Sequence, residues 1–209
     1  MAEKVRLFYH PISHYCVSAE RMLRFKRIRT EIVYTPYHDH QALIRASGQD
    51  YIPTLDWSGQ FVTWSQIPAF LDRVQRKPEL VPGGKAGLAR TLESWGHLVL
   101  EERVWRAVVT QVPPTLRDDA ERWVFEELQT RSRGPFSVLA SRRKEFVADL
   151  DEYFGLIDAM LKGREWILDE PTVADFGIYG GLSSWMTVGE RLPGKYAHLV
   201  RWAERIRAL

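Results

Sequence analysis

The chain has 209 residues, of which 45% are hydrophobic and 27% charged; this excludes a disordered or fibrous protein and allows one or two domains. With 29 Lys and Arg against 27 Asp and Glu, the net charge of +2 does not predict a nucleic-acid partner. The single cysteine, Cys16, excludes an intramolecular disulfide and favours a reducing, cytoplasmic location, and no apolar run is long enough to predict a membrane span.

The first 35 residues predict a strand, a helix and a second strand. Val5–Tyr9 has the apolar pattern of a buried strand, and Ser13 is a residue type that commonly caps helices. Residues 15–27 have helical spacing, and residues 31–35 are rich in strand formers. We therefore expect a βαβ unit at the start of the chain.

The next forty residues predict a hairpin and a final helix. Residues 38–47 are expected to form a loop and a short helix. Residues 53–57 and 60–63 are two strand-forming runs around Ser58-Gly59, which is typical of a β-hairpin. Residues 65–76 complete a ββα unit as a short helix.

A segment rich in proline and glycine separates two halves of different character. Residues 78–85 contain two prolines and two glycines and are expected to be a linker between domains at 1–77 and 86–209. The second half shows almost only helical periodicity. Its apolar stripes are expected to be core faces; the first of them is Leu88, Leu92, Trp95 and Val99. Thr172 and Asp175 have the spacing of a capping box ahead of an apolar helix.

Four motifs in this order resemble the glutathione transferase superfamily. Leu7-Phe8-Tyr9-x-Pro11-x-Ser13-x-Tyr15-Cys16 resembles its first strand and active-site turn, and Ile52-Pro53-Thr54-Leu55 resembles its cis-proline stretch. The run 171–176 resembles the folding signature of its helical domain, and 199–202 its closing helix. The resemblance implies a thioredoxin-like βαβ-ββα domain followed by an all-α helical-bundle domain.

The resemblance also implies an activity. Members of this family bind glutathione and activate its thiol for attack on a small electrophile, which here would lie between the domains. Ser13, ahead of the first helix, is the expected hydrogen-bond donor to the thiolate, and Tyr9 is the alternative. Lowering a thiol pKa by about two units takes roughly 2.7 kcal/mol, which one charge-assisted hydrogen bond and a helix dipole can supply.

The expected glutathione-binding residues follow from the same motifs. The resemblance places His38 near the glycine end of glutathione. Pro53 is at the family's cis-proline position, and the backbone of Ile52 is expected to bind the cysteinyl part. Thr63, Trp64 and Ser65 stand where the family has an acid and a serine for the γ-glutamyl end, but none of them is acidic. Trp64 either attracts the ammonium group through its ring or packs between the sheet and a helix.

Several alternatives remain open at the level of the sequence. The missing acid favours a non-catalytic protein-interaction module on the same fold, and a glutathione-dependent lyase or isomerase is a third possibility. No metal site is predicted, although four of the six histidines lie between residues 10 and 40. Cys16 is expected to be a buried, inert residue, and the resemblance implies a homodimer.

Overall fold

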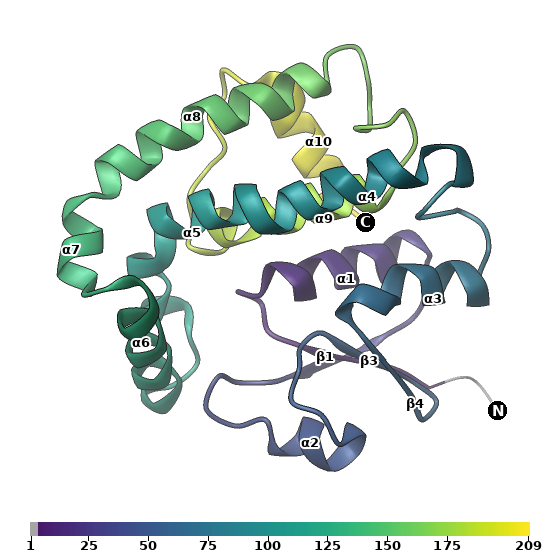
Figure 1. Cartoon of the computed structure of the whole chain (residues 1–209), viewed down its shortest axis with the longest axis horizontal. Helices are drawn as coiled ribbons and strands as arrows, with labels where there is room; N and C mark the ends of the chain where they lie inside the picture. Colours follow the sequence, from purple (N-terminus) through teal and green to yellow (C-terminus); the bar gives the residue numbers. More distant parts are fainter. Residues whose placement is uncertain (1–3) are drawn as a thin grey trace.

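The computed structural model describes residues 4–209, in which four strands form one sheet with helices on both sides (Figure 1). The strands are β1 (Val5–Tyr9), β2 (Glu31–Tyr34), β3 (Thr54–Trp57) and β4 (Gln60–Thr63), in the order β2-β1-β3-β4. β1 runs parallel to β2 and antiparallel to β3, and β4 is antiparallel to β3. The helices of this part are α1 (His14–Phe25), α2 (Gln41–Ser47) and α3 (Ile67–Val74). In Figure 1, α1 and α3 lie on one side of the sheet and α2 on the other.

The expected βαβ-ββα order is confirmed, with small differences at the ends of elements. The parallel pair β1–β2 needs a crossover, which α1 supplies. The hairpin turns at Ser58 and Gly59, whose φ angles of 51° and 94° match the twist of the flanking strands. The last helix begins later than expected, because Trp64–Gln66 forms a separate 3-10 turn before it.

The second half is a stack of helices around one central helix. They are α4 (Ala86–Trp95), α5 (Glu101–Val108), α6 (Asp119–Arg133), α7 (Phe136–Ser141), α8 (Arg143–Met160), α9 (Val173–Thr187) and α10 (Ala197–Arg207). α9 is buried along almost its whole length and contacts α1, α4 and α5. None of the described helices is both long and apolar enough to cross a membrane.

Glycines of α9 allow neighbouring helices to pack closely. A Cβ atom at Gly180 would lie 2.6 Å from the backbone oxygen of His14 in α1, where the two halves meet. One at Gly181 would lie 2.3 Å from the backbone oxygen of Gly96, within the second half. Ser18 of α1 donates a hydrogen bond to the backbone oxygen of Phe176 (2.7 Å). The two halves therefore meet through backbone contacts that a larger residue would prevent.

The expected capping box at the start of α9 is confirmed. The Thr172 hydroxyl accepts from the backbone N–H of Ala174, and the Asp175 carboxylate accepts from the backbone N–H of Thr172 (3.0 Å). The backbone N–H of Val173 also donates to the Leu80 carbonyl in the interdomain segment (2.9 Å). The box thus fixes both the helix start and the segment that leads into the second half.

The expected core face of Leu88, Leu92, Trp95 and Val99 is confirmed for Leu92 and Trp95, which are partly buried against the core, and is wrong for Leu88 and Val99. Leu88 is 54% exposed and Val99 is 40% exposed, whereas Ala89 and Leu100 are fully buried. α4 contacts α9 through its small residues, because Gly96 lies against Gly177 too closely for a side chain. The stripe consequently lies at the edge of the covered face, with Leu88 and Val99 turned toward solvent.

Candidate functional site

Ser13 caps the N-terminus of α1. Its Oγ accepts a hydrogen bond from the backbone N–H of Cys16 (3.4 Å), and its own backbone N–H donates to the His10 carbonyl (3.1 Å). Apart from the Cys16 thiol, the hydroxyl meets no acceptor among residues 4–209. The first turn of α1 contains no acidic residue to offset the positive end of the helix dipole. This position favours a negative charge beside Ser13.

Cys16 lies on the same helix but is fully buried. Burial raises the pKa of its thiol to about 12, although the hydrogen bond with Ser13 acts in the opposite direction. A thiol with so high a pKa carries almost no thiolate at neutral pH. Cys16 therefore fits the expected role of an inert, packed residue.

The Ile52–Pro53 peptide bond is cis, as the motif predicted. Pro53 is buried just before β3, and Ile52 is half-buried. Neither the backbone N–H nor the carbonyl of Ile52 forms a hydrogen bond with another described residue. These two groups can pair with an extended ligand as a neighbouring strand would.

Trp64 packs between the two halves of the chain. Its ring lies 4.5 Å from that of Tyr15 in α1 and 4.6 Å from that of His97, measured between centroids. Trp64 and Ser65 also line a cavity of about 310 Å³ that opens between the halves. Thr63 does not line this cavity, and its hydroxyl donates weakly to Gln66 (3.4 Å).

Two buried residues of this cavity were missed by the sequence reasoning. One carboxylate oxygen of Glu93 accepts from Arg90 (2.9 Å), while the other has no partner within the described protein. Neither ring nitrogen of His97 has a partner there either. Burial, together with the charge of His14, lowers the pKa of His97 to about 2, which keeps the ring neutral. The spacing of four between Glu93 and His97 was the available signal, since it places both on one helix face.

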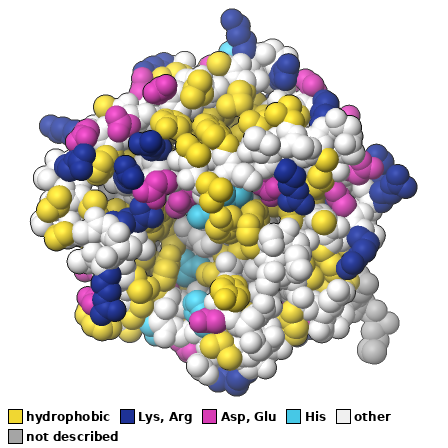
Figure 2. All heavy atoms as spheres, in the orientation of Figure 1, with side chains coloured by type: hydrophobic (Ala, Val, Ile, Leu, Met, Phe, Trp, Pro, Cys, Tyr) yellow, Lys and Arg dark blue, Asp and Glu magenta, His cyan; other side chains and the backbone are white. Residues whose placement is uncertain are grey.

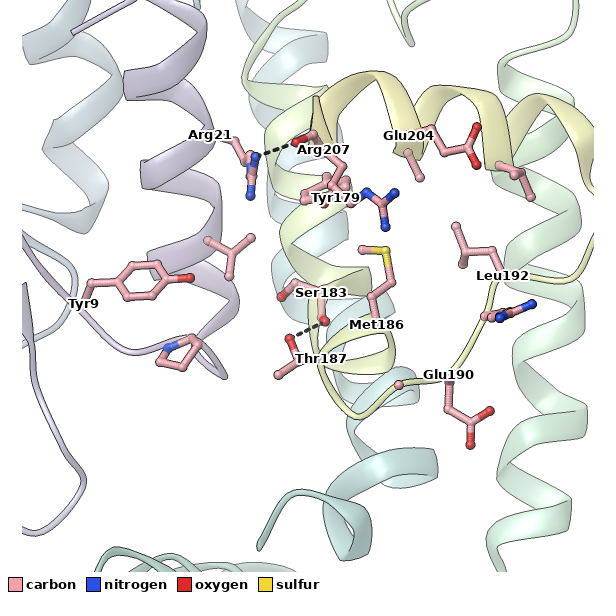
Figure 3. A pocket seen from close by; sticks show the side chains of 16 residues that line it. Tyr9, Arg21, Tyr179, Ser183, Met186, Thr187, Glu190, Leu192, Glu204 and Arg207 are labelled. Carbon is pink, nitrogen blue, oxygen red and sulfur yellow. Dashed lines mark hydrogen bonds between the residues drawn. The ribbon is translucent and has the colours of Figure 1, made fainter. Parts of the chain in front are cut away.

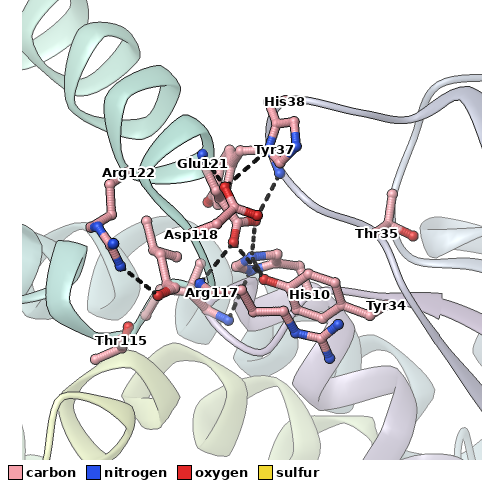
Figure 4. Close-up of polar contacts among 12 residues, drawn as sticks. His10, Tyr34, Thr35, Tyr37, His38, Thr115, Arg117, Asp118, Glu121 and Arg122 are labelled. Atoms are coloured by element: carbon pink, nitrogen blue, oxygen red, sulfur yellow. Dashed lines mark hydrogen bonds and ion pairs between the residues drawn. The ribbon is translucent and has the colours of Figure 1, made fainter.

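A third missed residue, Glu121 of α6, joins the two halves on the other side of Ser13. Its buried carboxylate accepts hydrogen bonds from His10 Nε2 (3.0 Å), the Tyr34 hydroxyl (2.7 Å) and the backbone N–H groups of Tyr37 (2.9 Å) and Arg117 (3.2 Å) (Figure 4). His10 Nδ1 accepts from the backbone N–H of Ile12 (3.2 Å), so Nε2 carries the proton. Every oxygen of this carboxylate is thus paired.

The charges of this cluster follow from its contacts. Burial lowers the pKa of His10, and the nearby Glu121 only partly offsets it, so the imidazole is neutral. Burial alone would raise the pKa of Glu121, but the hydrogen bonds from Tyr34, Tyr37 and Arg117 outweigh it and lower the pKa below its usual value. The cluster therefore consists of an ionised carboxylate held by neutral donors.

His38 lies at the edge of the same cluster. Its Nδ1 is 4.0 Å from a carboxylate oxygen of Asp118, the N-cap residue of α6, and its side chain is partly exposed. His40 instead forms a hydrogen bond with Asp50. Within residues 4–209, no group of three or more His, Cys, Asp or Glu side chains is arranged to hold a metal ion.

Trp64 and Ser65 line the cavity between the two halves, whereas Ser13 and His38 do not line it. Figure 2 shows a hollow on this face of the molecule, with histidine side chains gathered along it. Tyr9, the alternative donor, instead lines a separate cavity between α1, α9 and α10. Burial raises the pKa of its phenol, so it stays protonated at neutral pH.

The fold is shared with solved structures, although no family model and no curated protein matches the chain. Glutaredoxin 2 from Salmonella typhimurium, solved in complex with glutathione, superimposes with a TM-score of 0.81 at 15% identity, covering 99% of this chain and 94% of that one. The chain has the glutathione S-transferase fold. A glutathione S-transferase from Sinorhizobium meliloti 1021 gives a TM-score of 0.75 at 16% identity, covering 99% and 89% of the two chains. One from Rhodospirillum rubrum F11 gives 0.74 at 18%, covering 98% and 88%. The predicted glutathione transferase-like architecture is confirmed over nearly the whole chain.

Replacing Glu121 by glutamine should lower the free energy of unfolding by about 2–3 kcal/mol near neutral pH. The amide removes one acceptor and leaves a buried donor, such as Tyr34, unpaired. Because the pKa of Glu121 is lower in the folded state than in the unfolded chain, the carboxylate stabilises the fold above its unfolded pKa, and this contribution is lost as the pH falls through the folded pKa. Urea unfolding at a series of pH values should therefore show the difference from wild type narrowing in acid.

Glu126→Gln is the matched control, because Glu126 is an exposed residue of the same helix with no ion pair among residues 4–209. It should change stability little at any pH. A Glu121→Gln variant as stable as this control near neutral pH would show that the cluster does not hold the halves together.

Proposed function

We propose that the chain binds glutathione in the interdomain cleft and activates its thiol for attack on a small electrophile. The observation that carries the proposal is Ser13, whose hydroxyl stands at the N-terminus of α1, in a first turn without an acidic residue. A thiolate beside it would accept a charge-assisted hydrogen bond and interact favourably with the helix dipole. Ser13 rather than Tyr9 is proposed as the donor, because Tyr9 lines a different cavity.

The proposed step uses only these groups and solvent. The thiol proton leaves to water, and Ser13 stabilises the resulting thiolate. The sulfur lone pair then forms the new carbon–sulfur bond. The displaced electron pair of the electrophile goes to its leaving group or to an adjacent carbonyl oxygen.

The rest of the cleft supports the recognition of a tripeptide. The unpaired backbone groups of Ile52 match the cysteinyl amide, and Ser65 lines the cavity where the γ-glutamyl end would lie. Glu93 lines that cavity, and one of its carboxylate oxygens is buried without a partner among the described residues, so an ammonium group bound at this wall would supply one. In this proposal Glu93 replaces the acid missing at positions 63–65, and His38 meets the glycine end.

Replacing Glu93 by glutamine should weaken glutathione binding about tenfold to a hundredfold, because a hydrogen bond to a charged group contributes about 1.5–3 kcal/mol. Calorimetric titration of each variant with glutathione measures the effect. Glu102→Gln is the control, since Glu102 lies on α5, is paired with Arg106 and Arg133, and does not line the cavity. Equal dissociation constants for Glu93→Gln and wild type would remove Glu93 from the proposal.

Two substitutions of Trp64 test whether its ring contacts the ammonium group of glutathione or only packs between the halves. Trp64→Phe keeps an aromatic ring against Tyr15 and His97, so a purely packing role predicts little change in the dissociation constant for glutathione. Trp64→Ala, measured in the same titration, should weaken binding if the ring also meets the ammonium group, by the roughly 0.5–2 kcal/mol of such a contact. An unchanged constant in Trp64→Ala would leave Trp64 a packing residue only.

A non-catalytic interaction module is the second candidate, and the absence of an acid at positions 63–65 favours it. In either case, a second copy of the chain is the expected partner for the exposed side chains of Leu88, Leu98 and Val99. Absence of glutathione binding would favour the module.

A further inference from the structure

A second, larger cavity lies between α1, α9 and α10 (Figure 3). Its volume is about 650 Å³, which is within the range of small-molecule sites. It shares no lining residue with the cavity of Trp64 and Ser65, and Ser13 does not line it. The two cavities are therefore separate.

The lining of this cavity is mixed, with apolar side chains and two phenols beside charged and hydroxyl groups. Val17, Met186 and Leu192, which come from three different segments, supply its apolar part. Tyr9 points into it from the end of β1, and Tyr179 lies on α9 beneath Arg207 (Figure 3). Neither phenol has a hydrogen-bond partner among residues 4–209, so both can donate to a bound molecule.

Three arginines are among the residues that line the cavity. Arg21 of α1 pairs with Glu20 (3.0 Å) and donates to the backbone oxygen of Arg207 in α10 (3.1 Å), which ties the two halves together at this point. Arg191 and Arg207 have no ion-pair partner among the described residues. Both guanidinium groups are therefore available to an anion.

The acids of the lining do not balance these charges. Glu190 is already paired with Arg143 (2.5 Å), which does not line the cavity. Glu204 is the one lining acid without an ion pair within residues 4–209. Arg191 and Arg207 together carry two positive charges and Glu204 carries one negative charge, so the unpaired groups of the lining have an excess of about one positive charge.

We propose that this cavity binds a small organic anion: a monocarboxylate with an aromatic or aliphatic body. Guanidinium groups bind carboxylates through paired hydrogen bonds, and the apolar part of the lining would bury the body of the ligand. An excess of one positive charge matches a single carboxylate rather than a phosphate. The site is independent of the proposed glutathione reaction, since it shares neither Ser13 nor the Trp64 cavity.

Calorimetric titration of the full chain with 4-phenylbutyrate tests the proposal, with 4-phenylbutyramide as the uncharged analogue. The acid should bind at least about tenfold more tightly than the amide, as a charge-assisted hydrogen bond requires. Arg207→Glu should weaken binding of the acid by at least about tenfold, and Tyr179→Phe by about threefold or more. Arg201→Glu, an exposed change on the same helix away from the cavity, should leave the affinity unchanged.

Four results would overturn the proposal. Equal affinity for the acid and the amide would show that the arginines are not used, and an unaltered affinity in Arg207→Glu would show the same. Displacement of the acid by glutathione would place it in the other cleft. If the acid does not bind at concentrations up to about 10 mM, its affinity is too weak for a specific site, and the cavity does not bind this class of ligand. Circular dichroism of Arg207→Glu and Tyr179→Phe confirms that the variants are folded.

Discussion

Replacing Ser13 by alanine should lower the turnover of glutathione conjugation by one to three orders of magnitude. Removing a hydrogen-bond donor that points at a developing negative charge raises the activation free energy by about 3 kcal/mol. Without the hydroxyl, the dipole of α1 remains to stabilise the thiolate at this position. Steady-state assays with a small aromatic electrophile, at saturating glutathione, measure the effect.

The fold of Ser13→Ala should survive. The cap hydrogen bond from Cys16 is long (3.4 Å), so its loss should cost no more than about 1 kcal/mol. Ser13→Thr keeps a hydroxyl and is the matched control, expected to retain more turnover than alanine. If Ser13→Ala is as active as wild type, the role passes to Tyr9, and Tyr9→Phe is then the variant to assay.

Replacing Asp175 by alanine should destabilise the protein by about 3–5 kcal/mol. Its buried carboxylate accepts from the backbone N–H groups of Ile167 (2.9 Å) and Thr172 (3.0 Å) and from Trp202 Nε1 (3.0 Å). Removing it leaves three buried donors unpaired, each at a cost of about 1–3 kcal/mol, and part of that cost is relieved by local relaxation. The capping box alone would account for only about 1–2 kcal/mol.

Urea unfolding followed by circular dichroism measures this change. Asp149→Ala is the control, because Asp149 is exposed on α8 and has no ion pair among residues 4–209. Asp175→Asn should lie between wild type and Asp175→Ala, since an amide keeps one acceptor oxygen. Should the midpoints of Asp175→Ala and Asp149→Ala coincide, the network around Asp175 contributes nothing to stability.

Local signals in the sequence predicted much of the fold. The strand Val5–Tyr9, the hairpin at Ser58-Gly59 and the capping box of Thr172 and Asp175 each depend on residues close together in the chain. Turn conformations, caps and side-chain alternation are set by such neighbours. The cis bond before Pro53 was predicted from the resemblance to a known family rather than from periodicity.

The misassigned face of α4 and the missed acids have a common physical reason. Periodicity shows that Leu88 and Val99 share a helix face, but it does not show which face a neighbouring helix covers. Here the close contact between Gly96 and Gly177, which lie about eighty positions apart in the chain, decides which face is covered. Glu121 meets His10 across 111 positions, and only the fold brings the two together.

The pKa of the thiol of glutathione in complex with the protein is the most direct test of the proposed activity. The ultraviolet absorbance of the thiolate, followed against pH at saturating glutathione, gives this value for wild type and Ser13→Ala. We expect a pKa about two units below the roughly 8.5 of a free thiol in wild type, and a return toward that value in Ser13→Ala. A bound thiol that titrates like the free one in wild type, or a protein that binds no glutathione, would contradict the proposal.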